Sequence, residues 1–278
     1  TRAADRVFLS SALNNSKVKI PGVMGIPKKV ILQSALTVMA EEYVEKNEFL
    51  SSVSNIQRAV RTYAEASKEL NCAELCIKSQ FYEQNSSKIT RIRSAKDLET
   101  FAYECRRNRR FSSNNNIQSN FILEPFVETG KVVDFQFVQR EESSSESRWL
   151  KIYVGGIGPE GKMKALDPAC PVGVPEGRRK GKTHAYLDCV KDGKTKKLLF
   201  DEKKIESVVK PRIERVLNLT GISGVAMLRC FVNVDSGELI VEDVDHSPDM
   251  TERNGTFYHQ ALRYFHREEH TSELQSRS

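Results

Sequence analysis

The sequence predicts an α+β protein, in which amphipathic helices and short strands follow one another without a strict repeat. Apolar residues recur at helical spacing in four segments, and alternating or continuously apolar runs of strand length lie between them. The 278 residues are 39% hydrophobic and 29% charged, which suffices for one large core or two modest ones. No run approaches the roughly eighteen apolar residues of a transmembrane helix, so we expect a soluble protein with no membrane partner.

Charge and cysteine usage narrow the classes of partner. Lys and Arg number 43 against 37 Asp and Glu, and this net charge of +6 suits a phosphate-bearing ligand but is mild for a dedicated nucleic-acid binder. The basic clusters at 106–110 and 178–182 lie in predicted loops without interleaved aromatic residues, which disfavours nucleic acid further. The six cysteines occur singly, without a C-x-x-C pair, which favours a reducing, intracellular compartment.

Composition divides the chain into four segments. Residues 1–35 hold Pro and Gly close together and are predicted to be a linker or the remnant of an N-terminal domain. Residues 36–128 and 129–267 are predicted to be two α+β subdomains. Residues 268–278 include a run that one reading frame of a common sequencing-library adapter encodes, so we expect a non-native tail there.

The first subdomain is predicted to hold two helices and a pair of strands. Apolar residues at helical spacing, with basic residues between them, indicate the helices, and Ser94 with Asp97 approaches the capping-box pattern. Short apolar or alternating runs on either side of a polar turn at 80–87 indicate the strands. In chain order we expect a helix at 55–70, strands at 73–77 and 88–93, and a helix at 94–104.

The middle of the chain is predicted to be rich in strands. Residues 120–127 and 131–138 are predicted as two strands around the turn at 128–130, and residues 149–154 as another. Residues 168–182 are rich in Pro, Gly and basic residues, which predicts a long mobile connection of the kind that often covers a site.

The last third is predicted to contain a helix, a hairpin and a closing helix. Residues 201–217 have helical spacing, with Pro211 as a bend or as a boundary between two helices. Residues 224–234 and 238–244 are strongly apolar and are predicted to form the hairpin, and residues 257–266 the closing helix.

Acidic residues end the second strand of that hairpin. Asp243 and Asp245 should share one face of the strand, with Cα atoms about 7 Å apart, close enough to share a cation. Solvated residues at a strand end are an equally good interpretation of the spacing alone. The following turn at 247–251 leads to a helix start and could present backbone N–H groups to an anion.

Two further positions suit nucleotide binding. Lys78 follows a strand and precedes a Gln/Asn/Ser-rich loop, so it could offer a point charge to a phosphate while Ser86 donates a hydrogen bond. Glu124 and the backbone of Val127 could accept from an adenine amino group. The alternatives are an ordinary surface lysine and an edge strand closed by Pro125.

The order of these features along the chain resembles that of the ATP-grasp fold. A strand with a lysine comes first, followed by the loop, the strand that ends in Glu-x-x-Val, and the acidic strand before S-P-D-M-T. Within this fold, residues 75–262 are similar to the D-alanine–D-alanine ligase family, and several stretches to the plastid-type ligases of plants and algae. The resemblance implies two α+β subdomains enclosing a nucleotide site, with the family's N-terminal domain largely absent. It also implies a plastid location, with the cytoplasm as the alternative.

The resemblance assigns roles by position. Lys78 would bind the α and β phosphates of ATP, Ser86 would belong to the loop that covers them, and Glu124 with the Val127 backbone would hold adenine. In the family, ATP phosphorylates the carboxylate of one D-alanine, and the amine of a second D-alanine attacks the acylphosphate to form a dipeptide.

The resemblance also assigns the metal. Asp243 stands where the family has its metal-bridging Glu and Asp245 where it has a metal-ligating Asn, so both would bind Mg²⁺. However, Arg229 stands in place of a metal-binding Asp, and Met227 in place of an Arg that stabilises the transferring charge. Arg229 could instead form a salt bridge with both aspartates, which would weaken or abolish the metal site.

Two functions therefore stay open. One is an ATP-dependent carboxylate-amine ligase of this family. The other is a catalytically degenerate ATP-grasp domain that binds nucleotide weakly or has a structural role, with a second copy or a second ligase half as its partner.

Overall fold

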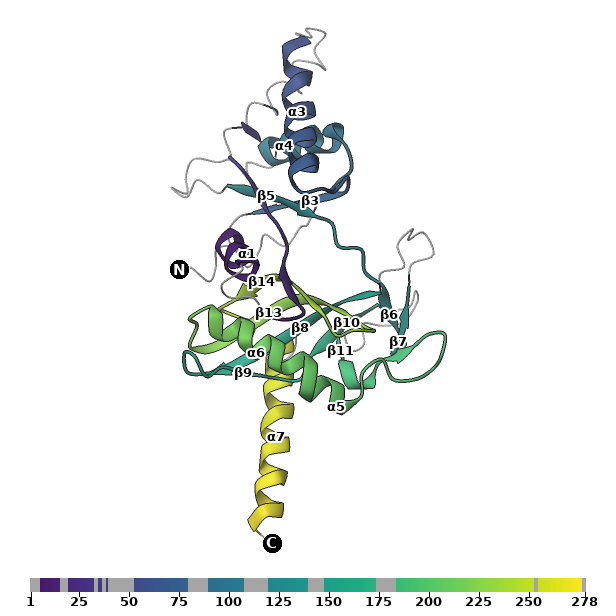
Figure 1. The fold of residues 1–278 in the computed structure, drawn as a ribbon, viewed down its shortest axis with the longest axis vertical. Coiled ribbons are helices and arrows are strands. Elements are labelled where there is room, and N and C mark those ends of the chain that lie inside the picture. The colour runs from purple at the N-terminus through teal and green to yellow at the C-terminus, as the bar shows by residue number, and fades with distance from the viewer. Residues whose placement is uncertain are drawn as a thin grey trace. The chain divides into compact units, whose positions relative to one another are not determined.

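The computed structural model describes residues 6–15, 20–32, 35–36, 39, 53–79, 90–107, 120–139, 148–173, 184–252 and 255–276. The chain forms two compact units, each with a sheet of its own (Figure 1). Unit 1 consists of Thr1–Gly25 with Val127–Ser278, and unit 2 of Ile26–Phe126. The predicted α+β class is confirmed.

Unit 2 contains a four-stranded antiparallel sheet in the order β2-β5-β3-β4. Its strands are β2 (Lys29–Ile31), β3 (Leu75–Ser79), β4 (Thr90–Ile92) and β5 (Phe121–Pro125), and its longer helices are α3 (Val53–Glu69) and α4 (Ala95–Arg107). Apolar side chains of both helices, among them Ala66 and Leu98, share one core with Leu75 and Leu123 of the sheet. Helices and sheet therefore bury their apolar faces against each other.

The start of α4 has the predicted capping box. The Ser94 hydroxyl accepts a hydrogen bond from the backbone N–H of Asp97 (3.2 Å), and the Asp97 carboxylate accepts one from the N–H of Arg93 (2.8 Å). Ser94 thus satisfies an N–H that the first helical turn leaves without an intrahelical partner, and Asp97 binds the chain just before the helix.

Unit 1 contains a ten-stranded sheet in the order β1-β14-β13-β8-β10-β6-β7-β12, with β9 on β8 and β11 on β10. Its strands are β1 (Val23–Gly25), β6 (Lys131–Val133), β7 (Gln136–Val138), β8 (Trp149–Gly158), β9 (Lys164–Ala165), β10 (Ala169–Gly173), β11 (His184–Tyr186), β12 (Lys191–Asp192), β13 (Gly224–Asn233) and β14 (Leu239–Asp245). Its helical segments are α1 (Arg6–Asn14), η3 (Leu187–Cys189), α5 (Glu202–Lys204), η4 (Ile205–Val209), α6 (Lys210–Leu219) and α7 (Thr256–Ser276).

Helices cover both faces of this sheet. Alternate residues of β8, such as Ile152 and Val154, share a core with Ile213 and Leu217 of α6. The opposite face of β8 and β13 packs against Phe257 of α7, which extends away from the sheet in Figure 1. Adjacent glycines fit this arrangement, because a Cβ atom on Gly155 would meet α7 and one on Gly156 would meet α6.

Gln260 attaches α7 to the sheet. Its fully buried amide accepts a hydrogen bond from the N–H of Gly155 and donates to the carbonyls of Tyr153 and Asp167, each at 2.8 Å. All three partners are main-chain groups, and the bonds to Gly155 and Asp167 are buried, so one side chain satisfies them together.

The helix predicted at 201–217 continues through Pro211 without a break. The turn before it, η4, is a π-helix, in which the N–H of Lys210 reaches the carbonyl of Ile205. Pro211 has no N–H to donate to the preceding turn, and widening that turn accommodates its ring.

Two predictions for the middle of the chain are wrong. Residues 131–138 are not one strand but the hairpin of β6 and β7 in unit 1, whereas 120–127 contributes β5 to the sheet of unit 2. Residues 168–182 are not all a connection, since Ala169–Gly173 is a strand paired with β8, β6 and β11. Residues 174–183 and the predicted turn at 80–87 lie outside the described residues.

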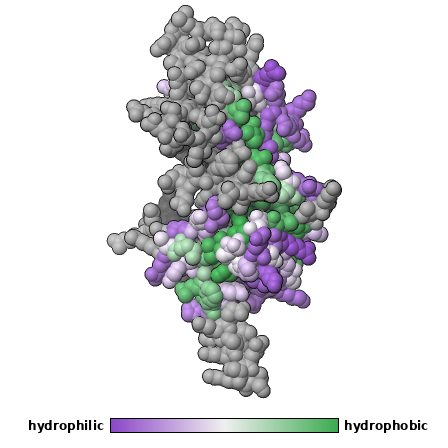
Figure 2. All heavy atoms as spheres, turned by 90° about the vertical axis from the view of Figure 1, so that its left-hand side faces the viewer, coloured by the Kyte–Doolittle hydropathy of each residue, from purple (hydrophilic) through white to green (hydrophobic). Residues whose placement is uncertain are grey.

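The predicted end segments also contain regular structure. Residues 1–35 contribute α1 and β1 to unit 1 and β2 to unit 2. At the other end, α7 continues into the predicted non-native tail. Figure 2 shows apolar residues at the surface between hydrophilic ones. Among the large hydrophobic residues of the described chain, Met24 and Leu32 are 48% and 58% exposed. Within the described part of the chain, no helix combines the length and apolarity of a membrane span.

The turn after β12 depends on one carboxylate. Asp192 accepts hydrogen bonds from the N–H groups of Thr195 and Lys194 (2.8 Å each) and from Arg148 (2.6 Å). The bond from Thr195, together with those from Arg148 and Lys194, lowers the pKa of Asp192 to about 2, although burial opposes the change. The ionised carboxylate thus holds the turn.

We expect Asp192 to contribute to acid unfolding. Since its folded pKa lies below the unfolded value of about 4, its stabilisation of up to about 2 kcal/mol is complete above pH 4 and lost as the pH falls toward 2. Asp192→Asn should therefore be less stable at pH 7 and lose less on acidification, measured by urea unfolding with Trp149 fluorescence. The exposed Asp235, which contacts the same Arg148, is the control as Asp235→Asn, and an equal effect there would contradict the expectation.

Candidate functional site

Lys78 and Glu124 come together in the sheet of unit 2. The antiparallel pairing of β3 and β5 sets Cys76 opposite Glu124 and Lys78 opposite Ile122. Lys78 Nζ lies 2.5 Å from Glu124 Oε1, and the two side chains are only 3% and 2% exposed. The alternative of an ordinary surface lysine at position 78 is therefore wrong.

A second lysine, which the sequence analysis missed, contacts the same carboxylate. Lys28 Nζ lies 2.6 Å from Glu124 Oε2 and its side chain is 1% exposed. The Cys76 thiol donates to Glu124 Oε1 at 3.5 Å. Only the basic pair Lys28-Lys29 beside Pro27 hinted at this role, and it fell in the predicted linker. We call Lys28, Lys78 and Glu124 the buried triad.

The other predicted nucleotide residues are not part of this cluster. Ser86 lies outside the described residues, so its predicted role in a phosphate-covering loop stays a prediction. Val127 belongs to unit 1, whereas Glu124 belongs to unit 2, and between them the N–H of Phe126 donates to the carbonyl of Glu74 (2.8 Å).

Asp243 and Asp245 lie on one face of β14, as the spacing predicts, and face Arg229 of β13. The antiparallel register sets Arg229 opposite Asp243 and Met227 opposite Asp245. Arg229 Nε lies 3.6 Å from Asp243 Oδ1, and its Nη2 lies 3.8 Å from Asp245 Oδ2. The two carboxylates are 3% and 6% exposed, so the interpretation of solvated strand-end residues is wrong.

A β-bulge adds a third carboxylate, which the alternating pattern did not reveal. The register shifts between Arg229 and Cys230, and Glu242 is the extra residue on β14. Its side chain is 4% exposed and lies 2.7 Å from Nζ of Lys151 on β8. We call Glu242, Asp243, Asp245, Lys151 and Arg229 the carboxylate cluster.

The carboxylate cluster does not fit a magnesium ion. Mg²⁺ requires about six oxygen ligands in a near-octahedral arrangement. Across the described ranges, no group of three or more His, Cys, Asp or Glu side chains is placed to hold a metal. The guanidinium of Arg229 reaches both aspartates, so a cationic group already lies where the resemblance would place the ion.

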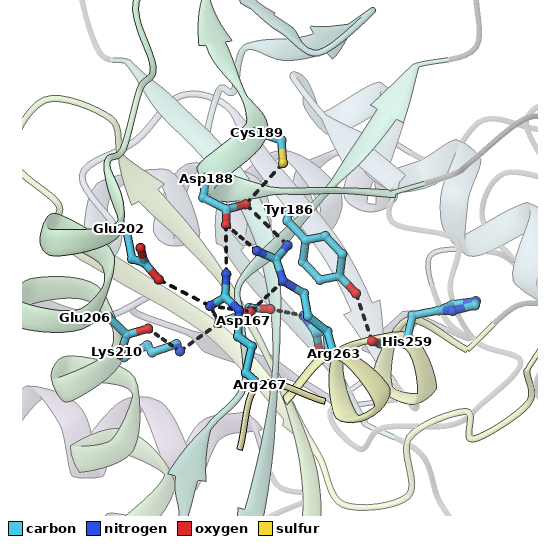
Figure 3. A network of polar contacts seen from close by, with 11 residues as sticks. Asp167, Tyr186, Asp188, Cys189, Glu202, Glu206, Lys210, His259, Arg263 and Arg267 are labelled. Carbon is cyan, nitrogen blue, oxygen red and sulfur yellow. Dashed lines mark hydrogen bonds and ion pairs between the residues drawn. The ribbon is translucent and has the colours of Figure 1, made fainter. Parts of the chain in front are cut away.

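A separate polar network holds α7 against the rest of unit 1 (Figure 3). Asp167 contacts Lys210 (2.8 Å), Arg263 (2.9 Å) and Arg267 (3.2 Å), and Asp188 contacts both arginines. Burial acts to lower the pKa of Lys210, but the bonds to Asp167 and a neighbouring glutamate outweigh it and raise the pKa. Every acid drawn in the network faces a base, which indicates a structural role.

Comparison with known proteins supports the fold. No protein-family model and no curated protein matches the chain. Its structure is similar to the D-alanine–D-alanine ligase of Coxiella burnetii (TM-score 0.50, 9% identity), the D-alanyl-alanine synthetase A of Vibrio cholerae (0.51, 14%) and the D-alanine–D-alanine ligase of Bacillus anthracis (0.52, 11%). These matches cover 92%, 94% and 95% of this chain, which spans 50%, 60% and 62% of theirs.

The chain therefore has the ATP-grasp fold, as the sequence predicts. At this level of identity the similarity establishes the fold alone. Activity, substrate and partners have to be argued from the residues of the chain.

Proposed function

We propose that the chain is part of an ATP-dependent carboxylate-amine ligase of the D-alanine–D-alanine ligase type, and that unit 2 binds the nucleotide. The buried triad is the observation that carries this proposal. Lys78 and Glu124 lie on the adjacent strands β3 and β5 of an ATP-grasp sheet, and Lys28 directly precedes β2. The two ammonium groups would offer point charges to phosphate oxygens, and the carboxylate an acceptor to adenine.

The reaction assigned by this proposal joins two D-alanine molecules. Lys78 would hold the α and β phosphates, and Glu124 would accept a hydrogen bond from the adenine amino group. The γ-phosphate would pass to a D-alanine carboxylate, and a second amine would displace it from the acylphosphate. The plastid location and the second ligase half belong to the proposal as well.

The second candidate is a catalytically degenerate ATP-grasp domain, and the carboxylate cluster favours it. Met227 stands where the transferring charge would need an arginine, and Arg229 contacts the residues that would bind the metal. Loss of one preorganised charge-stabilising group commonly slows a reaction about a hundred- to a thousandfold. Such a domain would bind nucleotide without turnover.

Nucleotide binding by Lys78→Met is the first test. We expect a dissociation constant for ATP, measured by calorimetry, at least about tenfold higher than that of the wild type, because a charge-assisted contact is lost. Lys29→Met is the matched control, since Lys29 pairs with the exposed Glu69 instead.

The same protein separates the two candidates. Formation of ADP and dipeptide from ATP and D-alanine supports the ligase, and binding without product supports the degenerate domain. Absence of ATP binding by folded wild-type protein contradicts the ligase and leaves the degenerate domain with a structural role only.

A further inference from the structure

We propose that Arg229 is the resident cation of the carboxylate cluster, that the cluster therefore excludes divalent cations, and that a neutral side chain at this position opens a divalent-cation site. The inference concerns unit 1 alone. It holds or fails independently of nucleotide binding by the buried triad, which lies in unit 2.

The backbone fixes Arg229 at its position. It pairs with Tyr153 of β8 on one side and with Asp243 of β14 on the other, so strands flank it on both sides. From there its guanidinium reaches Asp243 Oδ1 and Asp245 Oδ2 through two different nitrogens, at 3.6 and 3.8 Å. Both contacts are longer than a hydrogen bond, so the guanidinium acts on the two carboxylates as a nearby delocalised positive charge.

Burial makes a cation necessary here. Asp243 and Asp245 are 3% and 6% exposed, whereas Arg229 is 24% exposed. Two ionised carboxylates with so little water contact repel each other and lose hydration unless a positive group compensates. Arg229 provides that charge from the solvent side of the pair.

The charged groups around Arg229 predict the effect of replacing it by a neutral side chain. Lys151 lies 2.7 Å from Glu242, so this ammonium already pairs with a carboxylate of the cluster. Replacement of Arg229 by glutamine removes one positive charge beside Asp243 and Asp245, and a divalent ion at the same place would restore positive charge there. A free ion competes poorly in the wild type because it must shed water and displace a guanidinium tethered beside both carboxylates.

Binding of Mn²⁺ alone, followed by the electron paramagnetic resonance signal of the free ion, tests the proposal without nucleotide. We expect no binding to the cluster of the wild type at millimolar Mn²⁺. Arg229→Gln should bind one ion with a dissociation constant on the order of 10⁻⁴ to 10⁻³ M, typical of a weak oxygen site. The double variant with Arg229→Gln and Asp243→Asn should not bind this ion.

Two controls decide the cause of any gain. Arg215→Gln removes an exposed arginine of α6 and should gain nothing. Arg229→Lys keeps a cation at the position and should exclude Mn²⁺ as the wild type does.

Either of two results would overturn the proposal. One is Mn²⁺ binding by the wild type that Asp243→Asn removes. The other is a folded Arg229→Gln variant, with a wild-type circular dichroism spectrum, that gains no site. If Arg229→Gln fails to fold, the comparison of wild type with Asp243→Asn still decides whether the cluster excludes the ion.

Discussion

Replacement of Glu124 by Gln is expected to destabilise unit 2 by about 3–5 kcal/mol. Glutamine has the same size as glutamate but no charge, so the substitution leaves the buried ammonium groups of Lys28 and Lys78 without this counter-ion. Removal of one partner from a buried ion cluster is costly because water cannot replace it. Urea unfolding followed by hydrogen exchange of the β3 and β5 amides would measure the loss in unit 2 itself.

A matched pair in the same unit provides the control. Lys29 Nζ and Glu69 Oε2 are 2.7 Å apart, close to the distances in the buried triad, but the two side chains are 22% and 57% exposed. We expect Glu69→Gln to cost less than about 1 kcal/mol. Equal losses in the two variants would show that burial does not determine the role of Glu124.

A second large effect is expected for Gln260→Ala in α7, about 3–5 kcal/mol. The substitution removes three hydrogen bonds at once and leaves the buried N–H of Gly155 and two carbonyls without this partner. Each such group costs about 1–3 kcal/mol when water cannot reach it. Trp149, the only tryptophan, begins β8, the strand to which Gln260 binds, so its fluorescence during urea unfolding reports on unit 1.

The neighbouring position gives the control for α7. His259 is exposed on the same helix, and His259→Ala should change the free energy of unfolding by less than about 0.5 kcal/mol. A loss for Gln260→Ala no larger than this would mean that apolar packing around Phe257 is sufficient to hold α7.

Local signals predicted those elements whose pattern is determined within a few residues. The capping box at Ser94 and the apolar hairpin of β13 and β14 are of this kind, since each depends on near neighbours in the chain. The single strand predicted at 131–138 was wrong because its turn has no clear local signal. The chain reverses at Asp134 and Phe135, which both have positive φ, and neither is the glycine typical of such a turn.

The residues of the candidate site also differ in how far the sequence predicts their contacts. The common face of Asp243 and Asp245 follows from strand periodicity, and the family resemblance led us to expect their contact with Arg229. The register that sets Arg229 opposite Asp243 depends on the bulge, because a regular hairpin would pair Arg229 with Glu242. The bulge that brings Glu242 to Lys151 leaves no mark in the alternation of residues. Lys28 also gave no clear signal, because its partner Glu124 is almost a hundred residues away in sequence.

The division of unit 1 into two stretches of sequence has a consequence for the order of folding. β1 pairs in parallel with β14, and Val23 and its partner Leu239 are more than two hundred residues apart. During synthesis, all of unit 2 leaves the ribosome before β14 exists, so unit 2 can fold while β1 still has no strand to join. Pairing of β1 with β14 has to close this long loop, so we expect the sheet of unit 1 to form more slowly than unit 2 folds. Until β1 arrives, the edge of β14, with Leu239 and Val241, is open to pairing with another nascent chain.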